Sequence, residues 1–102
     1  MIYAKPGTEG AVVSFKSEYG NYIGGEWVLP ANGRYFTNTT PINGEAICRI
    51  PRSDAIDVNR AIDAAEKAKD AWGRTSVTER SNILLKIADR IEANLELLAV
   101  AE

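Results

Sequence analysis

The pattern of apolar and polar positions changes near residue 52. Before that point, over 22–51, short apolar and aromatic runs are separated by three turn signals, Gly24-Gly25, Asn32-Gly33 and Asn43-Gly44. Glycine reaches the positive φ angles that tight turns between strands require, and Asn-Gly pairs favour the same geometry. The pattern therefore predicts an antiparallel β-meander of short strands over 21–51.

The last predicted strand, 45–50, alternates strictly between its two faces. Glu45, Ile47 and Arg49 share one face, and Ala46, Cys48 and Ile50 share the other. The preceding residues, 1–20, show no sustained period, so we expect an irregular N-terminal arm, in which 11–15 is the one stretch able to pair as a short strand.

Two stretches with helical spacing follow. Ser53 or Asp54 is a suitable N-cap for a first helix over about 54–72, and Gly73 is expected as the residue that follows its end. The apolar residues of this first helix form a narrow, alanine-rich stripe on one side. Trp72 continues this stripe, and its ring is expected to be buried in the core. Ser76 and Glu79 form a capping box that opens a second helix over about 77–100.

The second helix carries a broader apolar stripe, made of Leu84, Ile87, Ala88, Ile91, Leu95 and Leu98. A short join between helices favours antiparallel neighbours, so the sequence predicts a helical hairpin over 53–102 and an α+β fold. The stripe reaches the last residues without a Gly or Pro stop signal, which indicates a chain truncated at its C-terminus.

Composition narrows the possible functions. The chain has 102 residues, enough for one small domain, and a formal charge of −2 that gives no electrostatic reason to expect nucleic acid or an anionic membrane as a partner. It has no histidine, which removes Ser-His, Cys-His and His-metal chemistry. A single cysteine forms no internal disulfide, and no apolar stretch has signal-peptide length, so we expect a cytoplasmic protein.

Few residues are candidates for chemistry. Cys48 lies on an apolar strand face with no histidine to deprotonate it, which favours a structural role. Gly24-Gly25 precedes no helix and matches no phosphate-binding motif, so a turn is the better interpretation. The aromatic rings of Trp27, Tyr35 and Trp72 favour core packing over stacking on a ligand. The segment 38–41 offers oxygen ligands for a hard cation, or is simply the end of a strand.

Four phrases in a fixed order resemble the aldehyde dehydrogenase superfamily over about 20–102. They are YIGGEW at 22–27, TPINGE at 40–45, AIDAA at 61–65 followed by Trp72, and LLKIADRIE at 84–92. Thr40 stands where the family more often has Asn. The opening residues look most like bacterial acetaldehyde-type members.

This resemblance implies that 21–102 is the N-terminal part of an NAD-binding domain. In the family a cysteine thiolate attacks the aldehyde, hydride passes to NAD, and a glutamate activates water to release the acid. Those groups would lie beyond position 102, so we expect no catalytic and no cofactor-binding residue here. Asn38 and Thr39 match part of a monovalent-cation site whose further ligand would also lie beyond this chain.

The resulting expectation is an N-terminal fragment of an NAD-dependent aldehyde dehydrogenase, not catalytic alone, which forms a homo-oligomer through the exposed stripe. The alternative, from a different class, is a stand-alone module for self-association or protein interaction.

Overall fold

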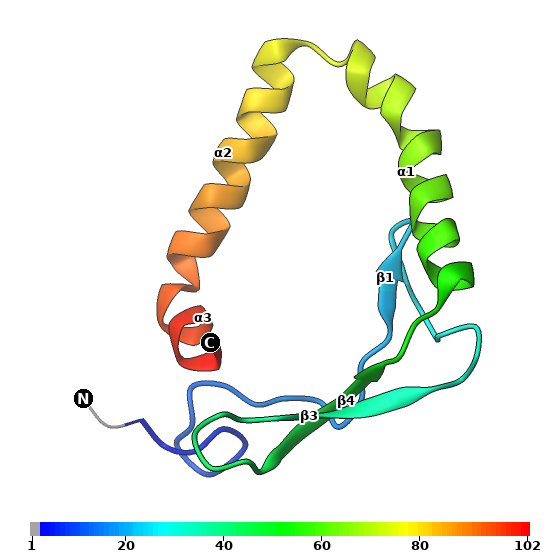
Figure 1. The fold of residues 1–102 in the computed structure, drawn as a ribbon. Helices are drawn as coiled ribbons and strands as arrows, with labels where there is room; N and C mark the ends of the chain where they lie inside the picture. The colour runs from blue at the N-terminus through cyan, green and yellow to red at the C-terminus, as the bar shows by residue number, and fades with distance from the viewer. Residues whose placement is uncertain (1–2) are drawn as a thin grey trace. The chain divides into compact units, whose positions relative to one another are not determined.

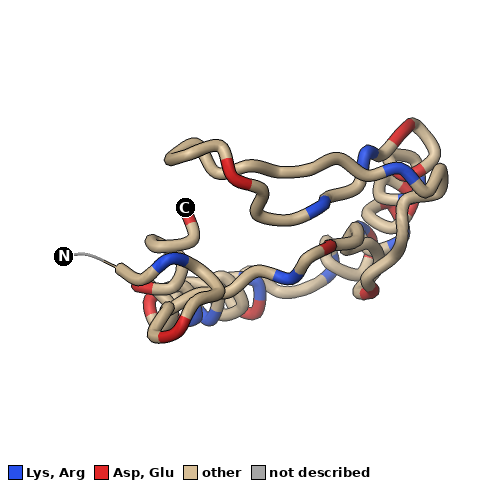
Figure 2. Tube along the Cα trace, turned by 90° about the horizontal axis from the view of Figure 1, so that it is seen from below, with Lys and Arg blue, Asp and Glu red and all other residues tan. Residues whose placement is uncertain are grey.

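The computed structural model describes residues 3–102 as four short strands followed by three helices (Figure 1). The chain divides into two compact units. One comprises Lys16–Gly73, and the other joins the residues up to Phe15 with Arg74–Glu102. Lysines and arginines are interspersed with acidic residues along the chain (Figure 2). None of the helices in the described part is long and apolar enough to cross a membrane.

The strands form two hairpins in place of one continuous meander. Strands β1 (Asn21–Ile23) and β2 (Glu26–Val28) pair antiparallel around Gly24 and Gly25, whose φ angles are +62° and +83°. Strands β3 (Tyr35–Thr39) and β4 (Ala46–Pro51) form a second antiparallel sheet. The α+β class with short antiparallel strands is confirmed.

The link between the hairpins uses its backbone groups locally, which is why the sheet does not continue through it. Pro30 has no N–H, and its carbonyl accepts from the N–H of Gly33 at 3.0 Å. The N–H of Arg34 donates to Oδ1 of Asn32 at 2.9 Å. These bonds close a turn, and the donors that a third strand would need are consumed.

The segment before β1 contributes more than an irregular arm. The Ser17 carbonyl accepts from the N–H of Arg49 at 2.8 Å, and the N–H of Tyr19 donates to the Arg49 carbonyl at 3.0 Å. An isolated parallel bridge thereby places Glu18 beside β4. The stretch 11–15 forms no strand, in agreement with the irregular interpretation.

Helix α1 (Ala55–Arg74) begins as expected and ends later. Oδ1 of Asp54 accepts from the N–H of Ile56 at 3.0 Å, so Asp54 caps the first turn. Gly73 lies inside the helix, and its predicted position beyond the end is wrong. Trp72 is 45% exposed, so the predicted burial of its ring is wrong as well. Gly73 does not adopt the positive φ of a residue that ends a helix, and α1 continues to Arg74.

The second predicted helix is divided in two. Helix α2 (Val77–Ala93) is capped by Ser76, whose Oγ accepts from the N–H of Glu79 at 3.1 Å, and α3 (Leu95–Ala101) follows Asn94. The Asn94 amide donates to the Arg90 carbonyl at 2.8 Å, a local side-chain bond that competes with continued helix. The antiparallel packing of the two predicted helices stays a prediction, because α1 and α2 belong to different units.

Little of the described chain is buried. Val13, Cys48 and Asp57 are at most 9% exposed, while the apolar side chains of all three helices are largely accessible. Such extensive apolar exposure exceeds what a self-sufficient small domain shows.

Candidate functional site

Asn38 and Thr39, the candidate cation ligands, lie at the end of β3 where the pairing with β4 becomes irregular. Asn38 is opposite Cys48, Thr39 is opposite Ala46, and the register shifts between them. Both side chains are exposed. A bulge of this kind redirects side chains at the edge of a sheet.

The turn after Thr39 is closed by its own hydrogen bonds. The N–H of Thr40 donates to the Glu45 carbonyl, the N–H of Gly44 donates to the Thr40 carbonyl, both at 2.9 Å, and the N–H of Ile42 donates to Thr40 Oγ1 at 3.3 Å. Among residues 3–102, no group of three or more Cys, Asp or Glu side chains could hold a metal ion. The described residues therefore supply neutral oxygen atoms at this position and no carboxylate cluster.

Cys48 is buried in β4, 9% exposed. The cation next to it in the sequence is engaged elsewhere: Arg49 Nη1 lies 2.9 Å from Oε2 of Glu18, and its guanidinium carbon is 4.8 Å from the centre of the Tyr35 ring. This burial agrees with the structural role expected for the thiol, and a catalytic role for Cys48 has no support in its surroundings.

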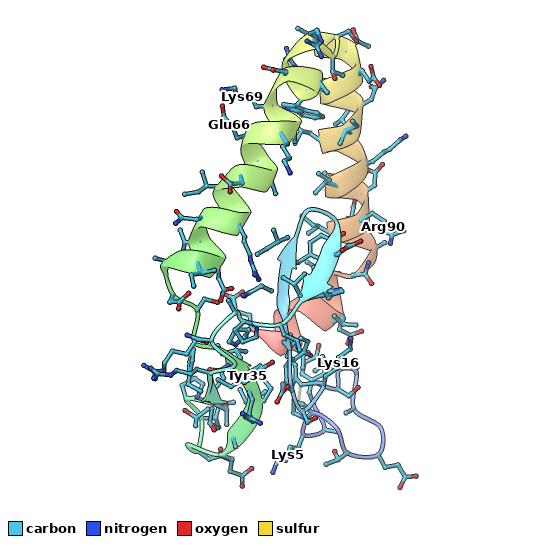
Figure 3. The ribbon with its side chains drawn as sticks, turned by 90° about the vertical axis from the view of Figure 1, so that its right-hand side faces the viewer. Lys5, Lys16, Tyr35, Glu66, Lys69 and Arg90 are labelled. Atoms are coloured by element: carbon cyan, nitrogen blue, oxygen red, sulfur yellow. The ribbon has the colours of Figure 1, made fainter. Side chains whose placement is uncertain are left out.

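The Glu18–Tyr35–Arg49 cluster was not anticipated from the sequence. Burial, together with the charge of the Glu18 carboxylate and its hydrogen bond, raises the pKa of Tyr35, while the Arg49 charge opposes the rise. Tyr35 is the first residue of β3 and is labelled in Figure 3. Its partners come from segments 14 to 17 residues away, so no local motif could reveal them.

Asp57 is the most buried polar residue described, at 3% exposed. Its Oδ1 accepts from the N–H of Ala31 at 3.0 Å, and its Oδ2 is buried without a hydrogen-bond partner. Because Asp57 lies in the first turn of α1, the positive end of the helix dipole offsets part of the cost of burying this carboxylate.

The two longer helices do not offer phosphate-binding N-termini. Asp54 and Asp57 place two carboxylates in the cap and first turn of α1, and Ser76 and Glu79 occupy the same positions in α2. These groups already satisfy amides or add negative charge that repels an anion. Gly24 and Gly25 join two strands and open no helix. Neither of these two helix N-termini therefore fits a pyrophosphate group.

A shallow groove of about 900 Å³ lies between the β1–β2 hairpin and α1. A Cβ at Gly24 would lie 3.9 Å from Cβ of Ala64, so the alanine-rich face lets the hairpin tip approach closely. The small alanine side chains of α1 thus allow the close approach of the β1–β2 hairpin. Arg60, Asp63 and Lys67 also line the groove.

Comparisons with known proteins agree with the motifs. The family model described as the aldehyde dehydrogenase family matches residues 27–102. The chain is 72% identical over 102 residues to an acetaldehyde dehydrogenase of Pseudomonas aeruginosa, covering 100% of this chain and 20% of that protein. It is 56% identical over 102 residues to a long-chain-aldehyde dehydrogenase of an Acinetobacter species, with the same coverage.

A solved structure shares the fold. The NAD-dependent aldehyde dehydrogenase of Sinorhizobium meliloti matches with a TM-score of 0.77 and 36% identity, over 96% of this chain and 20% of that one. The chain therefore spans about a fifth of the length of these relatives. From the motif order, the family match and the shared fold, we conclude that this chain belongs to the aldehyde dehydrogenase family.

Proposed function

We propose that this chain is the N-terminal part of an NAD-dependent aldehyde dehydrogenase, which oxidises an aldehyde to a carboxylic acid while NAD accepts the hydride. The observation that supports this most directly is 72% identity over the whole chain to an acetaldehyde dehydrogenase. Acetaldehyde is accordingly the substrate we would test first. The chain alone is proposed to be inactive, because Cys48 is buried and Arg49, the cation next to it in the sequence, is paired with Glu18.

A chimaeric enzyme tests this proposal. In it, the 102 residues of this chain replace the matching segment of the Pseudomonas aeruginosa acetaldehyde dehydrogenase. We expect the chimaeric enzyme to form NADH from acetaldehyde and NAD, and the 102-residue chain to form none. NADH production by the mass-verified chain alone would contradict the second expectation, and a folded but inactive chimaeric enzyme would contradict the first.

We also propose that Asn38 and Thr39 contribute oxygen ligands to a monovalent-cation site completed by other residues of the longer enzyme. The bulge at Thr39 and the proline that follows at position 41 support this, because they present the end of β3 at the sheet margin. In the chimaeric enzyme, Asn38→Ala should reduce the gain in melting temperature produced by potassium. An unchanged potassium effect would remove Asn38 from the site.

We also propose that the isolated chain self-associates. Its expected location remains the cytoplasm. The apolar stripe supports association, since Leu84, Ile87, Ile91 and Leu95 are 61%, 50%, 52% and 63% exposed. Light scattering across a micromolar dilution series should give a mass above 11.1 kDa. A mass of 11.1 kDa at every dilution would exclude association through the stripe at these concentrations.

A further inference from the structure

An apolar groove of about 420 Å³ extends along α2 into α3. Its floor consists of branched side chains from both helices: Ile83, Ile87, Ile91, Leu97 and Leu98. The bend at Asn94, which itself lines the groove, allows α3 to contribute its leucines alongside the isoleucines of α2. A single straight helix would present its apolar residues as one ridge, so the groove depends on the break between α2 and α3.

The groove stays open within the described chain. Ile87, Ile91 and Leu98 remain 50%, 52% and 44% exposed. The N-terminal arm reaches α3, where Tyr3 is hydrogen-bonded to Glu96. Val13 of this arm is buried, whereas the three groove residues are not. Removing large aliphatic side chains from water is strongly favourable, so this surface is suited to an apolar occupant.

The edge of the groove is cationic. Lys86 and Arg90 line it at i,i+4 spacing, and no acidic residue does. Neither side chain takes part in the ion pairs Arg49–Glu18 and Lys69–Glu66. Figure 3 shows Arg90 projecting from α2. The fitting occupant is therefore an apolar segment that carries carboxylates along one side.

A second copy, which we propose covers this surface when the chain is isolated, is a poorer occupant of the groove than a partner that carries carboxylates. A two-fold interface would bring the same residues of both copies together, so two sets of Lys86 and Arg90 would surround one apolar centre. Like charges around a desolvated interface oppose association. Relatives of this chain, in contrast, have about four fifths of their length outside the matched segment.

We propose that the α2–α3 groove is the docking surface for a carboxylate-bearing apolar segment from the remaining part of an aldehyde dehydrogenase chain, and that it binds this part even when the two are separate polypeptides. The inference rests on the proposed function. It adds which face carries the association and which chemistry the partner segment presents.

A binding experiment tests the proposal without catalysis. The chain is mixed with the remainder of the Pseudomonas aeruginosa acetaldehyde dehydrogenase, produced without the segment that matches this chain, and binding is measured without NAD or aldehyde. We expect a one-to-one complex. Ile87→Glu should weaken it about ten- to hundredfold, because a large apolar side chain is replaced by a charge. Glutamate keeps high helix propensity, so α2 should persist in circular dichroism.

Matched controls separate the groove from general surface effects. Ile42→Glu changes an isoleucine that is 91% exposed outside the groove, and it should leave the affinity unchanged. Arg90→Glu should weaken binding several-fold, whereas Lys16→Glu, an exposed lysine outside the helices, should not. Equal losses from Ile87→Glu and Ile42→Glu would overturn the proposal, as would a homodimer of this chain that excess remainder does not displace.

Hydrogen exchange in the chimaeric enzyme gives a second measurement, which also decides the matter if the separate remainder does not fold. We expect the amides of 83–98 to exchange much more slowly there than in the isolated chain. Equal exchange rates would overturn the docking proposal even if the enzyme is active. A protected α2 in an inactive chimaeric enzyme would support docking and contradict only the proposed activity.

Discussion

Oδ1 of Asp57 accepts a hydrogen bond from the backbone N–H of Ala31 at 3.0 Å, and this bond ties the first turn of α1 to the link between the two hairpins. Two further bonds tie the same link to the residues before α1. The Asn32 amide donates to the Arg52 carbonyl at 3.1 Å, and the N–H of Arg52 donates to the Arg34 carbonyl at 2.9 Å. Polar bonds thus hold a region where few apolar side chains are buried.

Asp57→Ala should lower the free energy of unfolding by about 1–3 kcal/mol, because the Ala31 N–H loses its partner in a part-buried position. Chemical denaturation of the variant measures this loss, and faster hydrogen exchange at Ala31 would localise it. Asp63→Ala is the matched control, since Asp63 is exposed on the same helix. Equal effects of the two substitutions would show that the bond contributes nothing specific.

Gly20→Ala and Gly73→Ala should change stability in opposite directions. A Cβ at Gly20 would lie 2.7 Å from the Val28 carbonyl oxygen, so the substitution should destabilise by about 1–3 kcal/mol. A Cβ at Gly73 meets nothing within 4 Å, and its helical backbone accepts alanine, so a gain of about 0.5–1 kcal/mol is expected. Urea unfolding of both variants provides the comparison. A neutral Gly20→Ala would mean that the chain there relaxes away from Val28.

Ser76→Ala should remove about 0.5–2 kcal/mol from the stability of α2, since the N–H of Glu79 loses its acceptor. Thermal unfolding followed by circular dichroism measures the change. Ser76→Asp should retain most of the stability, because aspartate is an equally good N-cap. A similar loss in both variants would show that the hydroxyl acts through something other than capping.

Tyr35 should titrate above its usual pKa of 10.0. Burial and the Glu18 carboxylate both disfavour the phenolate in the folded chain, so the folded pKa lies above the unfolded one. The resulting stabilisation is fully present below the unfolded pKa and is lost as the pH rises through the folded pKa. Phenolate absorbance should show this late transition, which disappears in Tyr35→Phe. Glu18→Gln should lower the pKa only in part, because burial is the larger cause.

Cys48→Ala in the chimaeric enzyme should leave turnover near that of the parent, because the Cys48 thiol is buried in β4. Steady-state NADH formation from acetaldehyde gives the comparison. A loss of about a hundredfold or more, the scale expected for a catalytic group, would assign Cys48 to the chemistry.

Local signals in the sequence determined the elements and the family. The Gly-Gly and Asn-Gly pairs specify turns through the φ angles they tolerate, and Ser76 specifies the start of α2 through one side-chain bond. Each of these depends on residues within a few positions, so a single sequence reveals them. The four sequence segments that resemble the aldehyde dehydrogenase family can likewise be read locally.

Contacts between residues far apart in the chain are visible only in the tertiary structure. The buried Asp57 accepts its hydrogen bond from Ala31, 26 positions away. The pKa of Tyr35 is raised by burial and then by Glu18, which no spacing rule connects to it. The bend at Asn94, which creates the groove, depends on whether its amide bonds back to Arg90 or leaves α2 uninterrupted. Competition between such local bonds and the regular backbone pattern is settled by the surrounding contacts, so helical periodicity could not predict it.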